Sequence, residues 1–225
     1  MTIILIIIGL LLIFVIGFIQ VVRNNSKIIR EHKFALEYRE GFVKFANKYF
    51  KGSNNWGETG KLDNELYTWL TKNIYKIQRN VGSFGIMDYT APYQRFRVPN
   101  YEIIINTIPK FKLGNIENFD VTYVDDSLLR YIGYIEEQML DNAKDLKNPI
   151  IWFRVGVQII FSIPLLFLNW FGILSLKNIN KFKNNLFYQI STGIMGLVAF
   201  VSGIIAIITG WDKLIIFVNQ IIDKL

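Results

Sequence analysis

The residues best suited to hold a ligand lie between Asp88 and Tyr101, where aromatic and basic side chains alternate. Two arginines in this stretch, Arg95 and Arg97, have the forked geometry that binds a phosphate. Three aromatic rings can stack beside them: Tyr93, Phe96 and Tyr101. A nucleotide, a nucleic acid or a lipid headgroup would each fit this chemistry. The alternative is a solvated loop whose aromatic residues cover a core. The stretch contains no Walker loop, dinucleotide fingerprint or kinase loop.

Carboxylates occur in two adjacent pairs, Asp125/Asp126 and Glu136/Glu137. General acid–base catalysis would need an apolar enclosure around one member, and the sequence indicates none. The chain has no cysteine and one histidine, His32. These counts exclude disulfides, thiolate catalysis and cysteine or multi-histidine metal sites. We therefore predict no catalytic residue, no metal site and no cofactor, and the sequence does not favour an enzyme.

Three long apolar runs indicate where the chain lies: Thr2 to Val22, Ile150 to Leu174 and Leu186 to Trp211. A helix of about 20 residues spans roughly 30 Å, the thickness of the hydrocarbon core of a bilayer. The sequence thus predicts an integral membrane protein that crosses the bilayer three times. The first run lacks a preceding cation and a small-residue cleavage site, so we expect a retained anchor rather than a signal peptide.

The second predicted span carries a stripe of polar residues, which we call the polar stripe: Arg154, Gln158, Ser162 and Asn169. At 100° per residue they lie within about 80° of one another on a helix. One interpretation is internal: Arg154 extends to the headgroups, Gln158 bonds a neighbouring helix and Ser162 bonds its own backbone. The other is that several copies of the chain line a pore with these groups.

The third predicted span has small residues at alternating spacings of four and three, which we call the small-residue seam: Thr192, Gly196, Ala199, Gly203, Ala206 and Gly210. Small residues let helix backbones approach closely in lipid. The seam either packs on the second span of the same chain or joins copies in a symmetric homo-oligomer.

Residues 23–148 are long enough for one soluble domain with its own core. Helical spacing of apolar residues predicts a helix from Lys27, a second from about Asp63 that ends at Gly82, and a third capped by Asp125 or Asp126. We expect residues 82–100 to be mostly irregular. Residues 101–108 could form a strand or a helix, ended by Pro109.

The predicted fold class is mainly α, with one N-terminal and two C-terminal transmembrane helices and a mostly helical cytoplasmic domain. The expected organisation is a span over 1–22, the domain over 23–148, a transmembrane hairpin over 149–211 and an amphipathic tail over 212–225.

Cations after the first span predict the orientation: Arg23, Lys27, Arg30 and Lys33. By the positive-inside rule they place the domain and the C-terminus in the cytoplasm, in a multi-pass inner-membrane protein. Lysines 177, 181 and 183 argue the other way. Within the domain, residues 23–112 carry 16 cations and 8 anions, whereas residues 113–148 carry 3 and 8. The two parts either face each other or meet different partners.

The layout of a helical domain joined to a few spans is similar to that of bacterial membrane effectors that act in defence against phage. That resemblance covers organisation only and implies an effector or a channel-like protein. Our leading hypothesis is a non-enzymatic membrane protein whose domain senses or binds a partner and whose spans self-associate to alter permeability or signalling. The alternatives are an anchored accessory subunit that docks a membrane or cytoplasmic protein, and a membrane-bound enzyme acting on a lipid or nucleotide. The expected partners are the lipid bilayer and a second copy or another protein.

Overall fold

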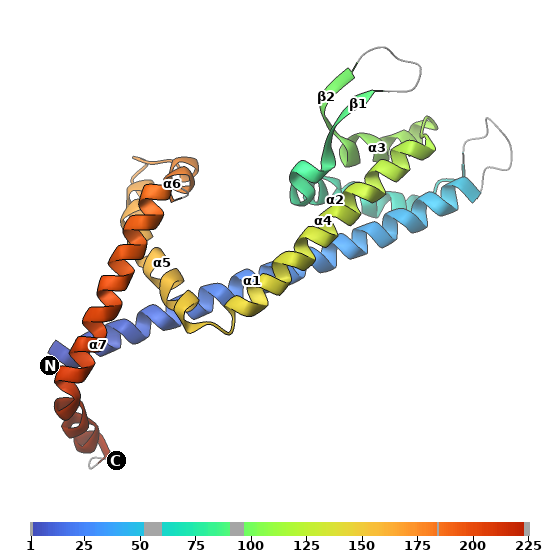
Figure 1. Ribbon diagram of the computed structural model, residues 1–225. Coiled ribbons are helices and arrows are strands. Elements are labelled where there is room, and N and C mark those ends of the chain that lie inside the picture. The colour runs from blue at the N-terminus through green and yellow to red at the C-terminus, as the bar shows by residue number, and fades with distance from the viewer. Residues whose placement is uncertain (1, 52–59, 91–96, 184, 223–225) are drawn as a thin grey trace. The chain divides into compact units, whose positions relative to one another are not determined.

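The computed structural model describes residues 2–51, 60–90, 97–183 and 185–222, and it is mainly helical (Figure 1). The elements are α1 (Thr2–Lys51), α2 (Asn64–Val81), η1 (Gly82–Gly85), β1 (Ile86–Thr90), β2 (Arg97–Glu102), α3 (Ile103–Leu113), α4 (Asn118–Asp145), α5 (Pro149–Trp170), α6 (Leu176–Lys183) and α7 (Leu186–Ile222). They form two compact units. Unit 1 comprises residues 1–25 and 141–225, and unit 2 comprises residues 26–140.

Among the described residues, three helices are long and apolar enough to cross a membrane, by length and composition: Ile7–Lys51 within α1, Pro149–Trp170 and Ile190–Gly210. The predicted mainly α fold with three spans is confirmed to this extent. Asn24, Asn25 and Ser26 lie between the predicted first span and the helix predicted from Lys27. They lie inside α1, which is continuous for 50 residues.

The core of unit 2 is built from the second half of α1 together with α2, α3 and α4. Its largest wholly buried side chains include Tyr38, Phe42 and Phe45 of α1 and Phe111 of α3. The phenyl rings of Phe45 and Phe111 meet edge to face, with their centroids 4.8 Å apart. These contacts give unit 2 a hydrophobic core to which all four helices contribute.

The predicted ends of α2 are confirmed. The carboxylate of Asp63 accepts hydrogen bonds from the backbone N–H groups of Glu65 and Leu66, both at 3.1 Å, which is the geometry of an N-cap. Gly82 follows the last residue of α2 with φ = 55°, a conformation that favours glycine at a helix end.

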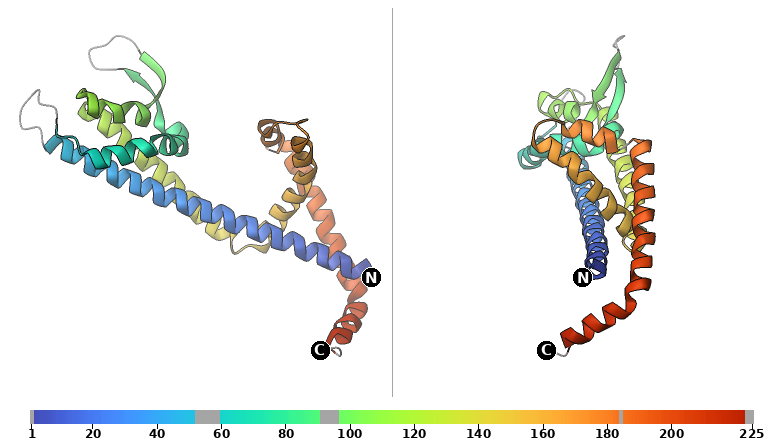
Figure 2. Two further views of the ribbon diagram at one scale, coloured as in Figure 1. Left: turned by 180° about the vertical axis from the view of Figure 1, so that it is seen from behind. Right: turned by 90° about the vertical axis from the view of Figure 1, so that its left-hand side faces the viewer.

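Helices α1 and α4 run antiparallel through unit 2, as Figures 1 and 2 show, and contacts between polar side chains join them. The guanidinium of Arg39 donates to both carboxylate oxygens of Asp125, at 2.7 and 3.1 Å. His32 Nε2 lies 3.2 Å from Glu136 Oε1. A third pair, Lys110 with Asp120, joins α3 to α4. These pairs bring the cationic residues 23–112 against the anionic residues 113–148.

The start of α4 differs from the prediction. The helix begins at Asn118, so Asp125 and Asp126 lie within it and neither is its cap. The first turn is held instead by Asp120, whose wholly buried carboxylate accepts from the backbone N–H of Glu117 at 3.3 Å. The carboxylate of Asp125 forms an ion pair with Arg39 instead.

The prediction that residues 82–100 are irregular is wrong over two short strands. β1 and β2 form an antiparallel hairpin in which Ile86 faces Glu102 and Thr90 faces Arg97. The buried side chain of Gln78 fixes its base, because it donates to the carbonyl of Gly85 at 3.0 Å and accepts from the N–H of Ile104 at 3.2 Å.

Residues 101–108 are divided between the end of β2 and α3, and Pro109 does not end that helix. α3 continues through Pro109 to Leu113. Burial of Ile108 and Phe111 on either side of the proline holds the chain helical there. Gly114 then ends α3 with φ = 70°, and its N–H donates to the carbonyls of Lys110 and Phe111.

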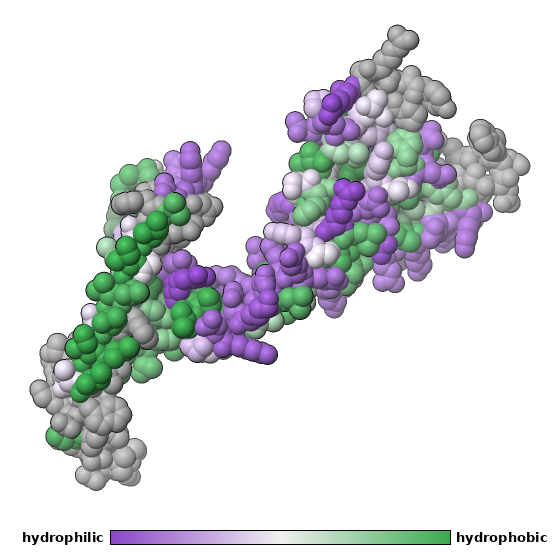
Figure 3. Space-filling model, viewed as in Figure 1, coloured by the Kyte–Doolittle hydropathy of each residue, from purple (hydrophilic) through white to green (hydrophobic). Residues whose placement is uncertain are grey.

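Unit 1 contains the first part of α1 together with α5, α6 and α7. Asn148 caps α5, since its side chain accepts from the N–H of Ile150 at 3.0 Å, and Pro149 occupies the first helical position. α7 continues through Ile222, so the backbone of the predicted tail extends the third span as one helix. In the part of α7 that Figure 3 colours, the visible face is mostly hydrophobic, and its exposed residues include Leu197, Val198 and Val201.

Candidate functional site

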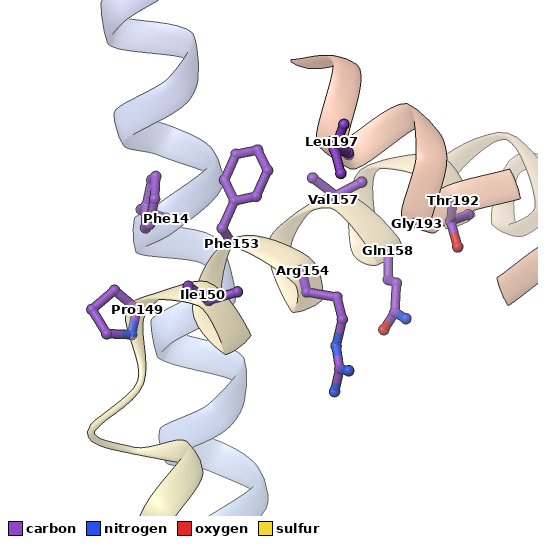
Figure 4. A pocket seen from close by; sticks show the side chains of 11 residues that line it. Phe14, Pro149, Ile150, Phe153, Arg154, Val157, Gln158, Thr192, Gly193 and Leu197 are labelled. Atoms are coloured by element: carbon purple, nitrogen blue, oxygen red, sulfur yellow. The ribbon is translucent and has the colours of Figure 1, made fainter. Parts of the chain in front are cut away.

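A cavity of about 490 Å³ lies between α5 and α7 in unit 1 (Figure 4). Its apolar wall comes from both helices and from Phe14 of α1, and it includes Phe153, Val157 and Leu197. Its polar groups are Arg154, Gln158 and Thr192. Among the described residues that line it, there is no Asp or Glu. The site is therefore an apolar pocket within one unit that carries a single cation.

The polar stripe divides into two parts. Arg154 and Gln158 line the cavity and extend from the same side of α5 (Figure 4), as residues four apart on a helix do. Ser162 is buried, and its hydroxyl donates to the carbonyl of Ile159 at 2.7 Å. Asn169 Nδ2 donates to the carbonyl of Leu174 at 2.5 Å. The backbone of the same chain thus satisfies the second half of the stripe, while the first half faces the cavity.

The small-residue seam meets the other two spans of the same chain. A Cβ placed on Gly196 would lie 3.4 Å from Cγ1 of Val157 on α5, and one on Gly203 would overlap the side chain of Leu10 on α1. Thr192 is buried, and its hydroxyl donates to the carbonyl of Tyr188 at 2.8 Å. Gly210 is buried as well. The side chains of Ala199 and Ala206 lie outside the described residues.

Two further glycines, which sequence reasoning missed, set the closest helix crossing in unit 1. A Cβ on Gly17 of α1 would overlap the carbonyl oxygen of Trp152, and a Cβ on Gly156 of α5 would overlap that of Ile13. Only glycine allows backbones to approach this closely. Aromatic pairs flank the crossing: Phe14 with Phe153, and Phe18 with Trp152. The available signal was a pair of glycines in each of these two apolar runs, and glycine is too common in spans to single out one position.

The aromatic and basic residues predicted to bind a ligand are only partly described. Tyr93, Arg95 and Phe96 lie outside the described residues. Arg97 forms an ion pair with Asp88 across the hairpin. The ring of Tyr101 stacks on that of Tyr89, with centroids 4.4 Å apart and planes 16° from parallel. The two described candidates are therefore occupied by partners within the hairpin.

A buried polar cluster beneath the hairpin was also missed. Lys110 Nζ donates to Asp120 Oδ1 at 2.8 Å and to the hydroxyl of Tyr89 at 2.9 Å, and Tyr89 donates to the same carboxylate oxygen at 3.1 Å. Burial alone would lower the pKa of Lys110. The hydrogen bonds to Asp120 and Tyr89 and the carboxylate charge outweigh burial, so that pKa is raised. Burial raises the pKa of Tyr89 and that of Tyr101.

This cluster holds three elements together: β1 through Tyr89, α3 through Lys110 and α4 through Asp120. Every polar atom described above has a partner within the cluster. Its chemistry is that of a structural ion pair, because a lysine with a raised pKa is protonated and cannot act as a base at neutral pH. The sequence carries no local signal for it, since the three residues are up to 31 positions apart.

No family model, curated protein or solved structure matches this chain.

Proposed function

We propose that this chain is a non-enzymatic membrane protein of the effector or channel-like class. Its helical domain binds a partner outside the bilayer. Its spans respond by associating with further copies, which alters membrane permeability or signalling. The large domain and the C-terminus lie in the cytoplasm of the inner membrane in this proposal, on the basis of the flanking cations.

The observation that carries the proposal is the continuity of α1. The first part of this helix is an apolar span, and the second part supplies Ala35, Tyr38, Phe42 and Phe45 to the core of unit 2. A partner that shifts the packing of this core acts on residues of the same helix that enters the bilayer. Helix α1 therefore supplies a physical route from a binding event to the spans.

The contacts of the candidate catalytic carboxylates support the proposal that the protein is not an enzyme. Asp125 is held by Arg39, and Glu136 by His32. Of the two arginines predicted to bind a ligand, Arg97 lies within the described residues, and it forms an ion pair with Asp88. These groups serve as ion-pair partners in unit 2, which favours a structural role over catalysis.

Self-association is proposed for a geometric reason. Within one chain the three spans contact one another pairwise, at Gly17 and Trp152, at Gly196 and Val157, and at Gly203 and Leu10. A water-filled path lined by polar groups would therefore need several copies. Since the seam glycines face their own chain, the proposed contact between copies uses the exposed side of α7, which includes Val198 and Val201.

Single cysteines test the association, because the chain has no native cysteine. Val198→Cys is placed on the exposed side of α7, and Ala199→Cys tests the seam itself. We expect disulfide-linked dimers in native membranes for Val198→Cys and a lower yield for Ala199→Cys. Monomers alone in both variants would contradict self-association.

Insertions between Asn25 and Ser26 test the coupling through α1. Gly-Pro-Gly breaks the helix. Seven alanines add almost two full turns, so that the faces of the helix keep their phase. We expect Gly-Pro-Gly to change the cross-linking yield of Val198→Cys and the ion permeability of reconstituted vesicles, whereas the seven-alanine insertion preserves both. Equal results for the two insertions would exclude coupling through the helix.

A further inference from the structure

Arg154 is an exposed cation at the edge of the cavity between α5 and α7, and the part of the chain that the structure describes offers it no ion pair. A charge left without an anion at a membrane helix is costly. We therefore expect an anion from outside the chain to bind the guanidinium of Arg154.

The depth of Arg154 matches the level of the lipid headgroups. It lies five residues after the start of α5, which is roughly 7 Å along a helix. Trp152 precedes it by two residues, and its indole N–H donates to the backbone carbonyl of Asp145 at 3.1 Å. Tryptophan with a bonded N–H is typical of the boundary between headgroups and hydrocarbon. An arginine at this boundary is within reach of lipid phosphates.

The remainder of the cavity suits a hydrocarbon chain. Beyond Arg154, Gln158 and Thr192, the described lining is apolar and includes Phe153, Val157 and Leu197. Its volume of about 490 Å³ falls in the range of about 300–1,000 Å³ that ligand pockets usually have. Gly193 leaves part of the wall open, because a Cβ placed on it would meet nothing within 4 Å.

We propose that this cavity binds an anionic phospholipid. The guanidinium of Arg154 holds the phosphate, the amide of Gln158 donates to a headgroup or ester oxygen, and one acyl chain lies along Val157 and Leu197. The inference rests on the proposed function only in placing α5 and α7 in a bilayer.

Charge complementarity selects a lipid over a second copy of the chain. The lining residues that the structure describes contribute one cation and no carboxylate. A symmetric contact between two copies through this surface would bring one Arg154 against the other, which is repulsive. An anionic lipid supplies the missing charge and the apolar tail together.

The test is native mass spectrometry of the full chain in mild detergent, with phosphatidylglycerol or phosphatidylcholine added at equal concentration. We expect the wild type to bind phosphatidylglycerol about tenfold more tightly, because both lipids carry the phosphate but the choline cation of phosphatidylcholine offsets its charge and is repelled by Arg154. Arg154→Gln abolishes this preference and Arg154→Lys retains part of it. Lys147→Gln is the matched control, because it removes an exposed cation that does not line the cavity.

The apolar part of the site is tested by filling it. Gly193→Phe places a ring into the cavity and reduces binding of both lipids by about tenfold. Gly9→Phe is the control, because Gly9 also has open space around it, lies on another span and does not line the cavity. A photoactivatable phosphatidylglycerol should label α5 and α7 peptides in the wild type and in Gly9→Phe, and far less in Gly193→Phe.

Three results would overturn the proposal. The first is an unchanged phosphatidylglycerol preference in Arg154→Gln. The second is displacement of the lipid by inorganic phosphate alone, which would indicate a soluble anion. The third is a dimer that forms in place of the lipid-bound species and disappears in Gly193→Phe, which would make a second copy the occupant. A monomer that binds phosphatidylglycerol as described would support the lipid site while contradicting self-association, so the two proposals fail separately.

Discussion

The ammonium group of Lys110 lies 2.8 Å from the carboxylate of Asp120, whose side chain is wholly buried. Tyr89 completes this pair from the hairpin above it. The cluster joins β1, α3 and α4, and it is the only place among the described residues of unit 2 where an acidic side chain is fully buried.

Asp120→Asn is expected to destabilise unit 2, because it leaves Lys110 without its counter-charge in a mostly buried site. Removing one partner of a buried pair costs about 2–3 kcal/mol when the other keeps some access to water. Amide hydrogen exchange of α3 and α4 should therefore accelerate roughly 30- to 150-fold.

Asp141→Asn is the matched control on the same helix, since the pair it forms with Lys144 is exposed. We expect it to change exchange rates by no more than about threefold. If Asp120→Asn and Asp141→Asn behaved alike, the cluster would not hold the three elements together.

Acid should loosen the start of α2 through Asp63. The hydrogen bond from Lys48 and those from the backbone of Leu66 and Glu65 lower the pKa of this carboxyl. A lowered pKa means that the stabilisation is present above the unfolded value of 3.8 and is lost as the pH falls through the lower folded value. Hydrogen exchange at the first turn of α2, followed from pH 6 to pH 2, measures this loss.

Asn at position 63 can still cap the helix but cannot titrate. Asp63→Asn should therefore remove the acid dependence at this turn while keeping its protection, and Asp63→Ala should lose protection at every pH. If the acid dependence persisted in Asp63→Asn, the group that titrates would be a residue other than Asp63.

Alanine at the α1–α5 crossing is expected to destabilise unit 1. A methyl group on Gly17 or Gly156 would meet backbone carbonyl oxygens, which cannot move aside as a side chain can. Overpacking of this kind costs about 1–3 kcal/mol. Thermal unfolding in mild detergent should show a lower Tm for Gly17→Ala and Gly156→Ala.

Gly9→Ala and Gly203→Ala serve as comparison variants in the same Tm measurement. A Cβ on Gly9 would meet nothing within 4 Å, so Gly9→Ala should leave the Tm unchanged or raise it. Gly203→Ala should fall between, because the atom in its way is the flexible end of Leu10. A Tm for Gly17→Ala equal to that of Gly9→Ala would refute the tight crossing.

The sequence predicted those elements whose signals are local. Hydropathy over about 20 residues identified the three spans, and single residues identified the two ends of α2: Asp63 and Gly82. These features depend on neighbouring residues in the chain, so a sequence pattern contains them.

The hairpin could not be predicted in the same way, because its base depends on Gln78, which bonds Gly85 and Ile104. The prediction that Pro109 ends the helix was wrong for a related reason. Burial of Ile108 and Phe111 stabilises the helix by more than the proline destabilises it. At the candidate site, periodicity placed Arg154 and Gln158 on one face. Only packing shows that Thr192 and Gly196 line the same cavity.

The most direct test of the central claim is the mass of the wild-type protein extracted from native membranes into lipid nanodiscs. Association of the spans predicts a defined homo-oligomer whose mass is an integer multiple of 26.3 kDa, and it predicts that the Gly-Pro-Gly insertion in α1 changes the proportion of that species. A single species at the monomer mass, unaffected by the insertion, would contradict the proposed function.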